Sequence, residues 1–225
     1  MPDAFWSPHM FASDRDLLVL EPRLFHDVGW SAQTLVNSAS AGSINAAGTT
    51  LTVTGVDFVA LGVEAGFVAL VAGSPFEVLA RLSATQLSVS RPRAHPDDAP
   101  IPGVAGSGLA VLVQSFRPQV GIVHGQVLRA LGLAQGDEPG DASRPTEAQV
   151  TNPQDLALVE ALGALHLVFA SAAALVSDNS LQWVKAQMYR QRFAEERARV
   201  AAEIDLNNDG APDAVRRMSV LQMVR

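Results

Sequence analysis

The chain has 225 residues, a net charge of −7 and a hydrophobic share of 48%. This composition predicts one large globular domain or two small ones and excludes a disordered chain. The acidic balance disfavours direct recognition of DNA or RNA, and the absence of cysteine excludes disulfides, thiol nucleophiles and cysteine metal sites.

The N-terminal part predicts a helix followed by a loop. The first residues, MPDAFWSPHMFASDRD, lack a basic stretch followed by an apolar run, so we expect no secretory signal. Asp14 or Asp16 can cap a helix that runs to about Val36. Residues 37–48, NSASAGSINAAG, are small and polar and include glycine, which is typical of a loop. We assign residues 1–48 to an N-terminal arm and the first helix of a helical domain.

Strand patterns dominate the next part of the chain. Gly or Pro residues separate short apolar segments that are rich in β-branched residues: TLTVTG, FVALVAG, FEVLARL, QLSVSRP and LAVLVQSF. They predict a small antiparallel β-barrel or sandwich over residues 49–116, inserted into a helical frame. The glycine-rich GVAGSGLA leads into a strand, whereas a phosphate loop leads into a helix, so we interpret it as a turn.

Two helices are predicted directly after the strands. Pro118 opens the first, and Gly132 closes it. Asn152 is expected to cap the second, which is apolar on nearly every face from Leu156 to Val176. Its most apolar run, Ala161–Val176, is too short to span a bilayer, so we expect a buried helix and no membrane partner.

A long charged helix is predicted from about Asn179 to Ile204. We expect six of its residues to lie in the core or between subunits: Trp183, Met188, Tyr189, Arg192, Phe193 and Glu196. The whole pattern predicts an α+β fold, with a frame of about four helices, the inserted β domain and an extended C-terminal tail. The helical domain covers residues 117–213, and the tail covers residues 214–225.

The stretch AEIDLNNDGAPD after this helix has two interpretations. Four residues match early ligands and the turn glycine of a calcium loop: Asp205, Asn207, Asp209 and Gly210. The twelfth position of such a loop needs a bidentate Glu and is Arg216 here, so we favour a simple turn. The alternative is a secreted or surface calcium-binding interaction module that uses Asp205, Asn207, Asp209 and Asp213.

No group of residues assembles an active site in the sequence. The histidines have no metal-ligand partner at helical spacing, and a nucleophile elbow is absent. His124 and His166 lie on apolar helix faces, where a lone histidine is usually a core or interface residue. We therefore expect no catalysis and no cofactor.

The C-terminal tail, AVRRMSVLQMVR, has too many apolar residues for a free terminus. Exposed apolar tails usually mark a partner surface, and adding as a strand to another chain is one such mode. The alternative is that the tail folds back on its own domain. The expected docking residues are Arg216, Arg217, Met218, Val220, Leu221, Met223, Val224 and Arg225.

The last helix, the Asp-rich turn and the tail together resemble the C-terminal part of tailed-bacteriophage head-to-tail adaptor proteins. These are also called head-completion or neck connector proteins. Their helix carries a Tyr-Arg-x-Arg-Phe/Tyr-x-Glu-Glu run, which here is Tyr189, Arg190, Arg192, Phe193, Glu195 and Glu196. The resemblance covers about residues 152–225 and is looser over residues 14–36 and 118–133.

The resemblance implies a structural virion protein of the neck, assembled in the host cytoplasm. A ring of about twelve copies would dock on the portal protein at the capsid vertex, because a closed ring matches the portal's symmetry. The tail would make this contact, and the ring would extend the DNA channel towards a stopper or tail protein. A net negative charge suits a channel through which double-stranded DNA slides without being bound.

Overall fold

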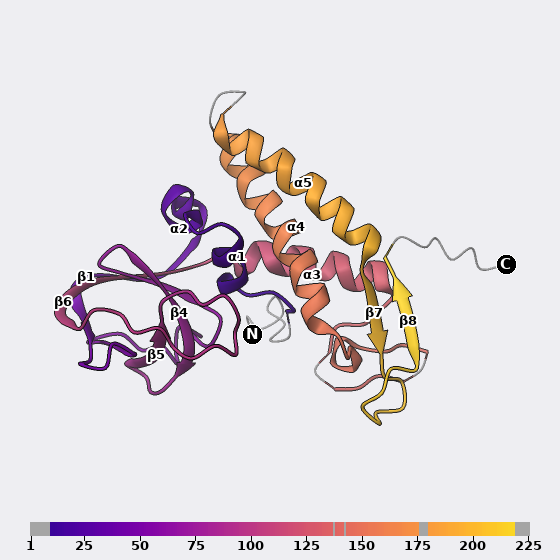
Figure 1. Cartoon of the computed structure of the whole chain (residues 1–225), viewed down its shortest axis with the longest axis horizontal. Coiled ribbons are helices and arrows are strands. Elements are labelled where there is room, and N and C mark those ends of the chain that lie inside the picture. The colour runs from indigo at the N-terminus through magenta and orange to yellow at the C-terminus, as the bar shows by residue number, and fades with distance from the viewer. Residues whose placement is uncertain (1–9, 137, 142, 176–179, 219–225) are drawn as a thin grey trace. The chain divides into compact units, whose positions relative to one another are not determined.

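The computed structural model describes residues 10–136, 138–141, 143–175 and 180–218, and it is a mixed α and β structure (Figure 1). The chain divides into two compact units. We call Ser13–Phe116 the barrel unit, and Arg117–Arg225 together with Met1–Ala12 the helical unit. The division at Phe116 lies where the sequence places the end of the β domain, but the barrel unit begins at Ser13 and not at Thr49.

Six strands of the barrel unit form a closed antiparallel barrel in the order β1-β2-β5-β4-β3-β6. They are β1 (Gln33–Ile44), β2 (Thr50–Val53), β3 (Val68–Val71), β4 (Ser74–Arg81), β5 (Gln86–Ser90) and β6 (Gly106–Ser115). Pairing of β1 with β6 closes the barrel. The expected small antiparallel β-structure is therefore confirmed, and it is a barrel and not a sandwich.

Alternating side chains of these strands fill the inside of the barrel, as expected of a barrel this small. In β2, Leu51 and Val53 are fully buried while the threonines between them are half-buried. The largest side chains of the barrel core are Phe58, Phe67 and Phe76. This interior is a packed apolar core, so it supplies stability to the barrel unit.

The prediction of one helix up to Val36 and a loop over residues 37–48 was wrong. The chain forms α1 (Asp14–Leu20) and α2 (Leu24–Asp27), then a 3₁₀ turn, then β1. Ser13, and not an aspartate, is the N-cap of α1, with the Asp16 carboxylate accepting from the Ser13 backbone N–H at 2.8 Å. The side chains of β1 are mostly small and polar, so the strand is held by its backbone ladder with β6, which is interrupted by bulges.

A buried charge cluster fastens α1 to the barrel. Glu77 of β4 accepts from Arg93 Nε at 2.6 Å and from Arg15 Nε at 3.1 Å, and its side chain is only 2% exposed. Arg15 also donates to the backbone carbonyl of Arg93 at 2.9 Å. Two guanidinium groups around one carboxylate satisfy the buried charge, which would otherwise be costly to hold away from water.

The helical unit packs three long helices and a two-stranded sheet. They are α3 (Arg117–Leu131), α4 (Pro153–Ala173), α5 (Leu181–Arg199), β7 (Ala201–Ile204) and β8 (Ala214–Arg217). The central helix α4 packs against both α3 and α5. Gly163 of α4 makes this close approach possible, since a Cβ there would lie 2.7 Å from Val123 and 3.0 Å from the Phe193 ring.

The expected ends of the helices are only partly correct. Gly132 ends α3 with a positive φ of 65°, and Leu133 N–H donates to Leu128 O, as in a Schellman cap. The last helix, however, ends at Arg199, because Val200 is extended and β7 follows. Asn152 precedes α4 but makes no capping bond; its Oδ1 instead accepts from Glu203 N–H of β7 at 2.8 Å.

Helix α4 is long and apolar enough to cross a membrane by length and composition alone. Within the described chain no other helix meets that test, and 61% of the tested stretch of α4 is buried inside the protein. Burial on nearly every face explains why α4 lacks a polar side.

Candidate functional site

The first part of the expected docking tail belongs to the helical unit itself. Ala214–Arg217 form β8, which pairs antiparallel with β7, and Met218 is buried in the core beside Val200 and Ile204. The prediction that this segment leaves its domain was therefore wrong, because β7 offers a partner edge directly across the turn. The other expected docking residues, Val220, Leu221, Met223, Val224 and Arg225, lie outside the described residues.

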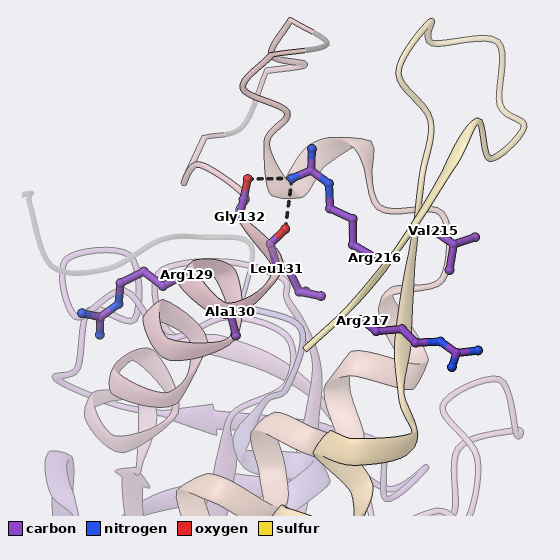
Figure 2. Close-up of a pocket in the computed structure, with 7 residues that line it drawn as sticks. All are labelled: Arg129, Ala130, Leu131, Gly132, Val215, Arg216 and Arg217. Carbon is purple, nitrogen blue, oxygen red and sulfur yellow. Dashed lines mark hydrogen bonds between the residues drawn. The ribbon is translucent and has the colours of Figure 1, made fainter. Parts of the chain in front are cut away.

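A hollow of about 680 Å³ lies between β8 and the end of α3 (Figure 2). Its lining residues are Arg129, Ala130, Leu131, Gly132, Val215, Arg216 and Arg217. Arg216 Nη1 donates to the carbonyls of Leu131 at 3.0 Å and Gly132 at 2.7 Å. Arg216 thus satisfies the last carbonyls of α3, which would otherwise lack partners. The Arg129 and Arg217 side chains point away from each other, so they do not converge on one ligand (Figure 2).

The Asp-rich stretch forms the turn between β7 and β8. Asp205 Oδ1 accepts from the backbone N–H of Asn208 at 2.6 Å, and Oδ2 accepts from Gly210 at 2.7 Å. Burial raises the pKa of Asp205, but the bonds from Gly210, Asn208 and the neighbouring amides outweigh it and hold the pKa below its ordinary value. Asn208 and Gly210 have positive φ values of 62° and 86°, as the turn interpretation requires.

The oxygens that a calcium ion would need are engaged within this turn. Asp213 Oδ2 accepts from Leu206 N–H at 2.9 Å, and Asp209 Oδ1 accepts from Ala211 N–H at 2.8 Å. Asn207 Oδ1 accepts from the Asp209 N–H at 2.9 Å. Among the residues that the structure describes, no cluster of three His, Asp or Glu side chains could hold a metal ion.

The expected core or interface residues of α5 separate into two groups. Tyr189 is buried and stacks on Phe169 of α4, with ring centroids 5.7 Å apart, and Phe193 packs against the same core. Trp183 and Met188 are 47% and 42% exposed. Arg192 is exposed with its guanidinium 5.9 Å from the Tyr189 ring, and Glu196 is half-buried.

Helix α5 leaves two sides uncovered within the helical unit. An apolar stripe follows one side, where Leu181, Val184 and Met188 recur at helical spacing and are 63%, 57% and 42% exposed. Trp183, Arg190 and Arg197 recur every seven residues and are exposed on another side. Three apolar side chains are therefore exposed together on one face of the helix.

The arginine side of α5 borders a groove of about 370 Å³ with α4. It is lined by His166, Arg190, Phe193, Ala194, Arg197 and Ala198. His166 Nδ1 donates to the Ala186 carbonyl at 3.1 Å, which leaves Nε2 as the other polar atom of the ring. In the part of the chain that the structure describes, neither Arg190 nor Arg197 forms an ion pair.

A group of three titratable side chains is buried in the helical unit. His124 of α3 bonds to Glu160 Oε1 of α4 through Nδ1 at 2.7 Å and to Glu147 Oε2 through Nε2 at 3.0 Å. All three residues are at most 3% exposed. Glu160 Oε2 also accepts from the Ala12 N–H at 3.0 Å, and the Phe11 ring packs edge-on against His124.

The two carboxylates of this cluster favour the protonated form of the His124 imidazole. Burial alone would lower the pKa of His124, but the bonds and charges of Glu147 and Glu160 raise it to about 9. Burial raises the pKa of the Glu160 carboxyl despite its bond to His124. The cluster is closed to solvent, so its chemistry is that of an anchor joining α3, α4 and the segment before Ser13.

The cluster was missed in the sequence, although His124 was correctly expected on an apolar helix face. A usable signal was present, because Glu160 is the one charged residue in the long apolar run of α4. A carboxylate in such a run needs a buried cationic partner. The lone histidine on the neighbouring helix was the natural candidate.

Comparisons with protein-family models, with curated proteins and with solved structures found no match.

Proposed function

We propose that this chain is a structural virion protein of a tailed bacteriophage, a head-to-tail adaptor in the neck. Its copies form a ring that docks on the portal protein and extends the DNA channel towards a stopper or tail protein. No catalysis and no cofactor are part of this function. In this proposal the helical unit is the frame, the barrel unit is inserted into it in sequence, and the residues after Met218 contact the portal.

The observation that carries the proposal is that α5 exposes two different sides, one apolar and one with arginines. A helix that closes a small monomeric domain buries one side and solvates the other with polar residues. Here the apolar stripe of Leu181, Val184 and Met188 is more than 40% exposed, and a separate arginine side faces outward. A subunit of a ring meets two neighbours through two different surfaces, and this arrangement fits that requirement.

Two further features support the proposal. The order of a buried helix, a charged helix, an Asp-rich turn and a terminal segment in residues 152–225 resembles the adaptor family. The net charge of −7 keeps affinity for DNA phosphates low. The calcium-binding alternative has less support, because Asp205 and Asp213 direct carboxylate oxygens at backbone amides of their own turn.

The test is co-sedimentation of the purified chain with capsids of the same virus that carry or lack the portal. The truncation that isolates the tail ends at Met218, because ending at Asp213 would also remove β8 and its core residue. We expect the full chain to sediment only with portal-bearing capsids, and the truncated chain to remain folded but lose docking. Equal sedimentation with both kinds of capsid, or with neither, would contradict the proposal.

A further inference from the structure

The groove beside α5 and an acidic loop of the same unit have matching chemistry. We propose that the groove lined by Arg190 and Arg197 binds the loop carrying Glu138 and Asp141 on a second copy of this chain. The inference rests on the proposed ring and deepens it by naming the contact between neighbouring copies. A contact between two different surfaces of identical chains repeats head to tail, so it builds a ring or a filament.

The groove is built for a ligand with two anionic groups and not for a single ion. Arg190 and Arg197 are seven residues apart on one helix, which corresponds to about 10 Å along its axis. Ala194 and Ala198 lie between and beside them, so the floor is low enough for a backbone to approach. Phe193 adds an aromatic wall, and Arg and aromatic residues are favoured in protein interfaces.

The charge of α5 differs from that of the rest of the chain. The helix contains five basic and two acidic side chains, whereas the whole chain has a net charge of −7. Among the described residues, the ion pairs of the chain involve none of Arg190, Arg192, Arg197 and Arg199. Arginines without an ion pair in their own chain, on a protein of net negative charge, are complementary to the acidic surface of another copy.

The acidic loop presents two carboxylates at a comparable spacing. Glu138 and Asp141 are both exposed, and three residues of chain span at most about 10 Å. Asp141 Oδ1 accepts from Ser143 N–H at 2.8 Å and from Arg144 N–H at 2.9 Å. Ser143 Oγ also donates to Oδ1, so these bonds leave Asp141 Oδ2 for another donor, and no ion pair among the described residues engages Glu138.

The loop is held in shape by its own unit. Gln149 Oε1 accepts from the Gly140 N–H at 2.9 Å and from the Thr146 N–H at 3.0 Å, and Thr146 Oγ1 donates to the Glu138 carbonyl at 2.7 Å. A second link ties Gln149 Nε2 to the Asp205 carbonyl at 3.0 Å. A loop fixed before binding loses little conformational entropy on docking, which favours association.

Sedimentation velocity of the purified full chain over a range of concentrations tests the contact. We expect concentration-dependent self-association that weakens with added salt, because exposed ion pairs are screened. Arg190→Glu with Arg197→Glu should weaken it about tenfold or more, since two attractions become repulsions. Arg129→Glu with Arg217→Glu makes the same charge change elsewhere on the helical unit and should leave it unchanged.

The decisive step is charge exchange between two variants. Glu138→Lys with Asp141→Lys should abolish self-association, and mixing this variant with the Arg190→Glu, Arg197→Glu variant should restore it. If the double change disturbs folding, Glu138→Lys alone replaces it in the mixture, because this variant leaves the hydrogen bonds of Asp141 intact. Absence of restoration in both mixtures overturns the proposal, as does a chain that stays monomeric at every concentration.

Three outcomes distinguish this inference from DNA binding and from the adaptor function. Arginines that bind DNA phosphates would give a duplex mobility shift that Arg190→Glu with Arg197→Glu removes while self-association persists, and that result overturns the inference. Self-association with charge exchange but without docking on portal-bearing capsids would contradict the adaptor function and leave the contact standing. Docking that is insensitive to both sets of charge reversal would contradict the contact alone.

Discussion

The imidazole of His124 joins three parts of the chain that lie far apart in sequence. It bridges Glu147, which precedes α4, and Glu160 in the middle of α4, while Phe11 covers its ring. Breaking a buried ion pair by removing one partner usually costs about 3–5 kcal/mol, because the remaining charge stays buried. The cluster is therefore expected to matter for stability and not for binding.

We predict that the helical unit loses stability as pH rises from 6.5 to about 9. The pKa of His124 is raised from 6.5 to about 9 in the folded chain, so the folded state holds this proton more tightly than the unfolded state. The resulting stabilisation is full below pH 6.5 and disappears as pH passes the folded pKa, by at most on the order of 3 kcal/mol. The raised pKa of Glu160 acts in the same direction.

Urea unfolding at several pH values, followed by circular dichroism, measures this effect. His124→Gln should unfold at lower urea at pH 6 and lose most of the slope between pH 6.5 and 9. His26→Gln, at an exposed position in the barrel unit, is the matched control and should keep the slope. An unchanged slope in His124→Gln would show that other groups control the pH dependence.

Helices and strands were predictable where side-chain patterns decide them, and less so where backbone pairing does. The alternating threonines and apolar residues of β2 and the apolar run of α4 identified both elements. β1 was taken for a helix end and a loop, since its small polar side chains give no period and its partner β6 is distant in sequence. Likewise β7 was absorbed into the preceding helix, because only pairing with β8 makes it a strand.

The candidate surfaces were likewise predictable only as far as the side-chain pattern of a single helix decides them. The spacing of apolar residues placed α5 correctly but could not tell which would face α4, and Tyr189 became core while Met188 stayed exposed. The groove with Arg190 and Arg197 depends on how α4 and α5 pack, which the sequence of one helix does not contain. Arg216 looked like a docking residue, but its carbonyl partners on α3 are 85 and 84 positions away.

At the scale of the helices, two glycines should respond in opposite ways to the same substitution. Gly163→Ala places a Cβ 2.7 Å from Val123 and 3.0 Å from Phe193, so it should separate the helices and cost about 1–3 kcal/mol. Gly125→Ala in α3 has nothing within 4 Å and should stabilise by about 0.5–1 kcal/mol through helix propensity. Urea unfolding of both variants measures this, and a shift in the same direction would refute the packing of α4 described here.

At the scale of the whole molecule, the chain consists of two units, each with its own hydrophobic core. The barrel unit closes on itself and carries its own charge cluster around Glu77. The helical unit carries the two surfaces that the proposed contacts use, which are the apolar stripe of α5 and the arginine groove. In the proposed adaptor, the ring and the portal contact belong to the helical unit.

The measurement that tests the adaptor proposal most directly is the position of this chain on intact particles. Antibody raised against the purified chain and coupled to gold can be applied to tailed particles of the virus that encodes it and viewed by electron microscopy. The account predicts label at one place on each particle, the neck between capsid and tail, and no label on capsids that lack a portal. Label spread over the capsid surface, confined to the tail tip or fibres, or absent from particles would contradict it.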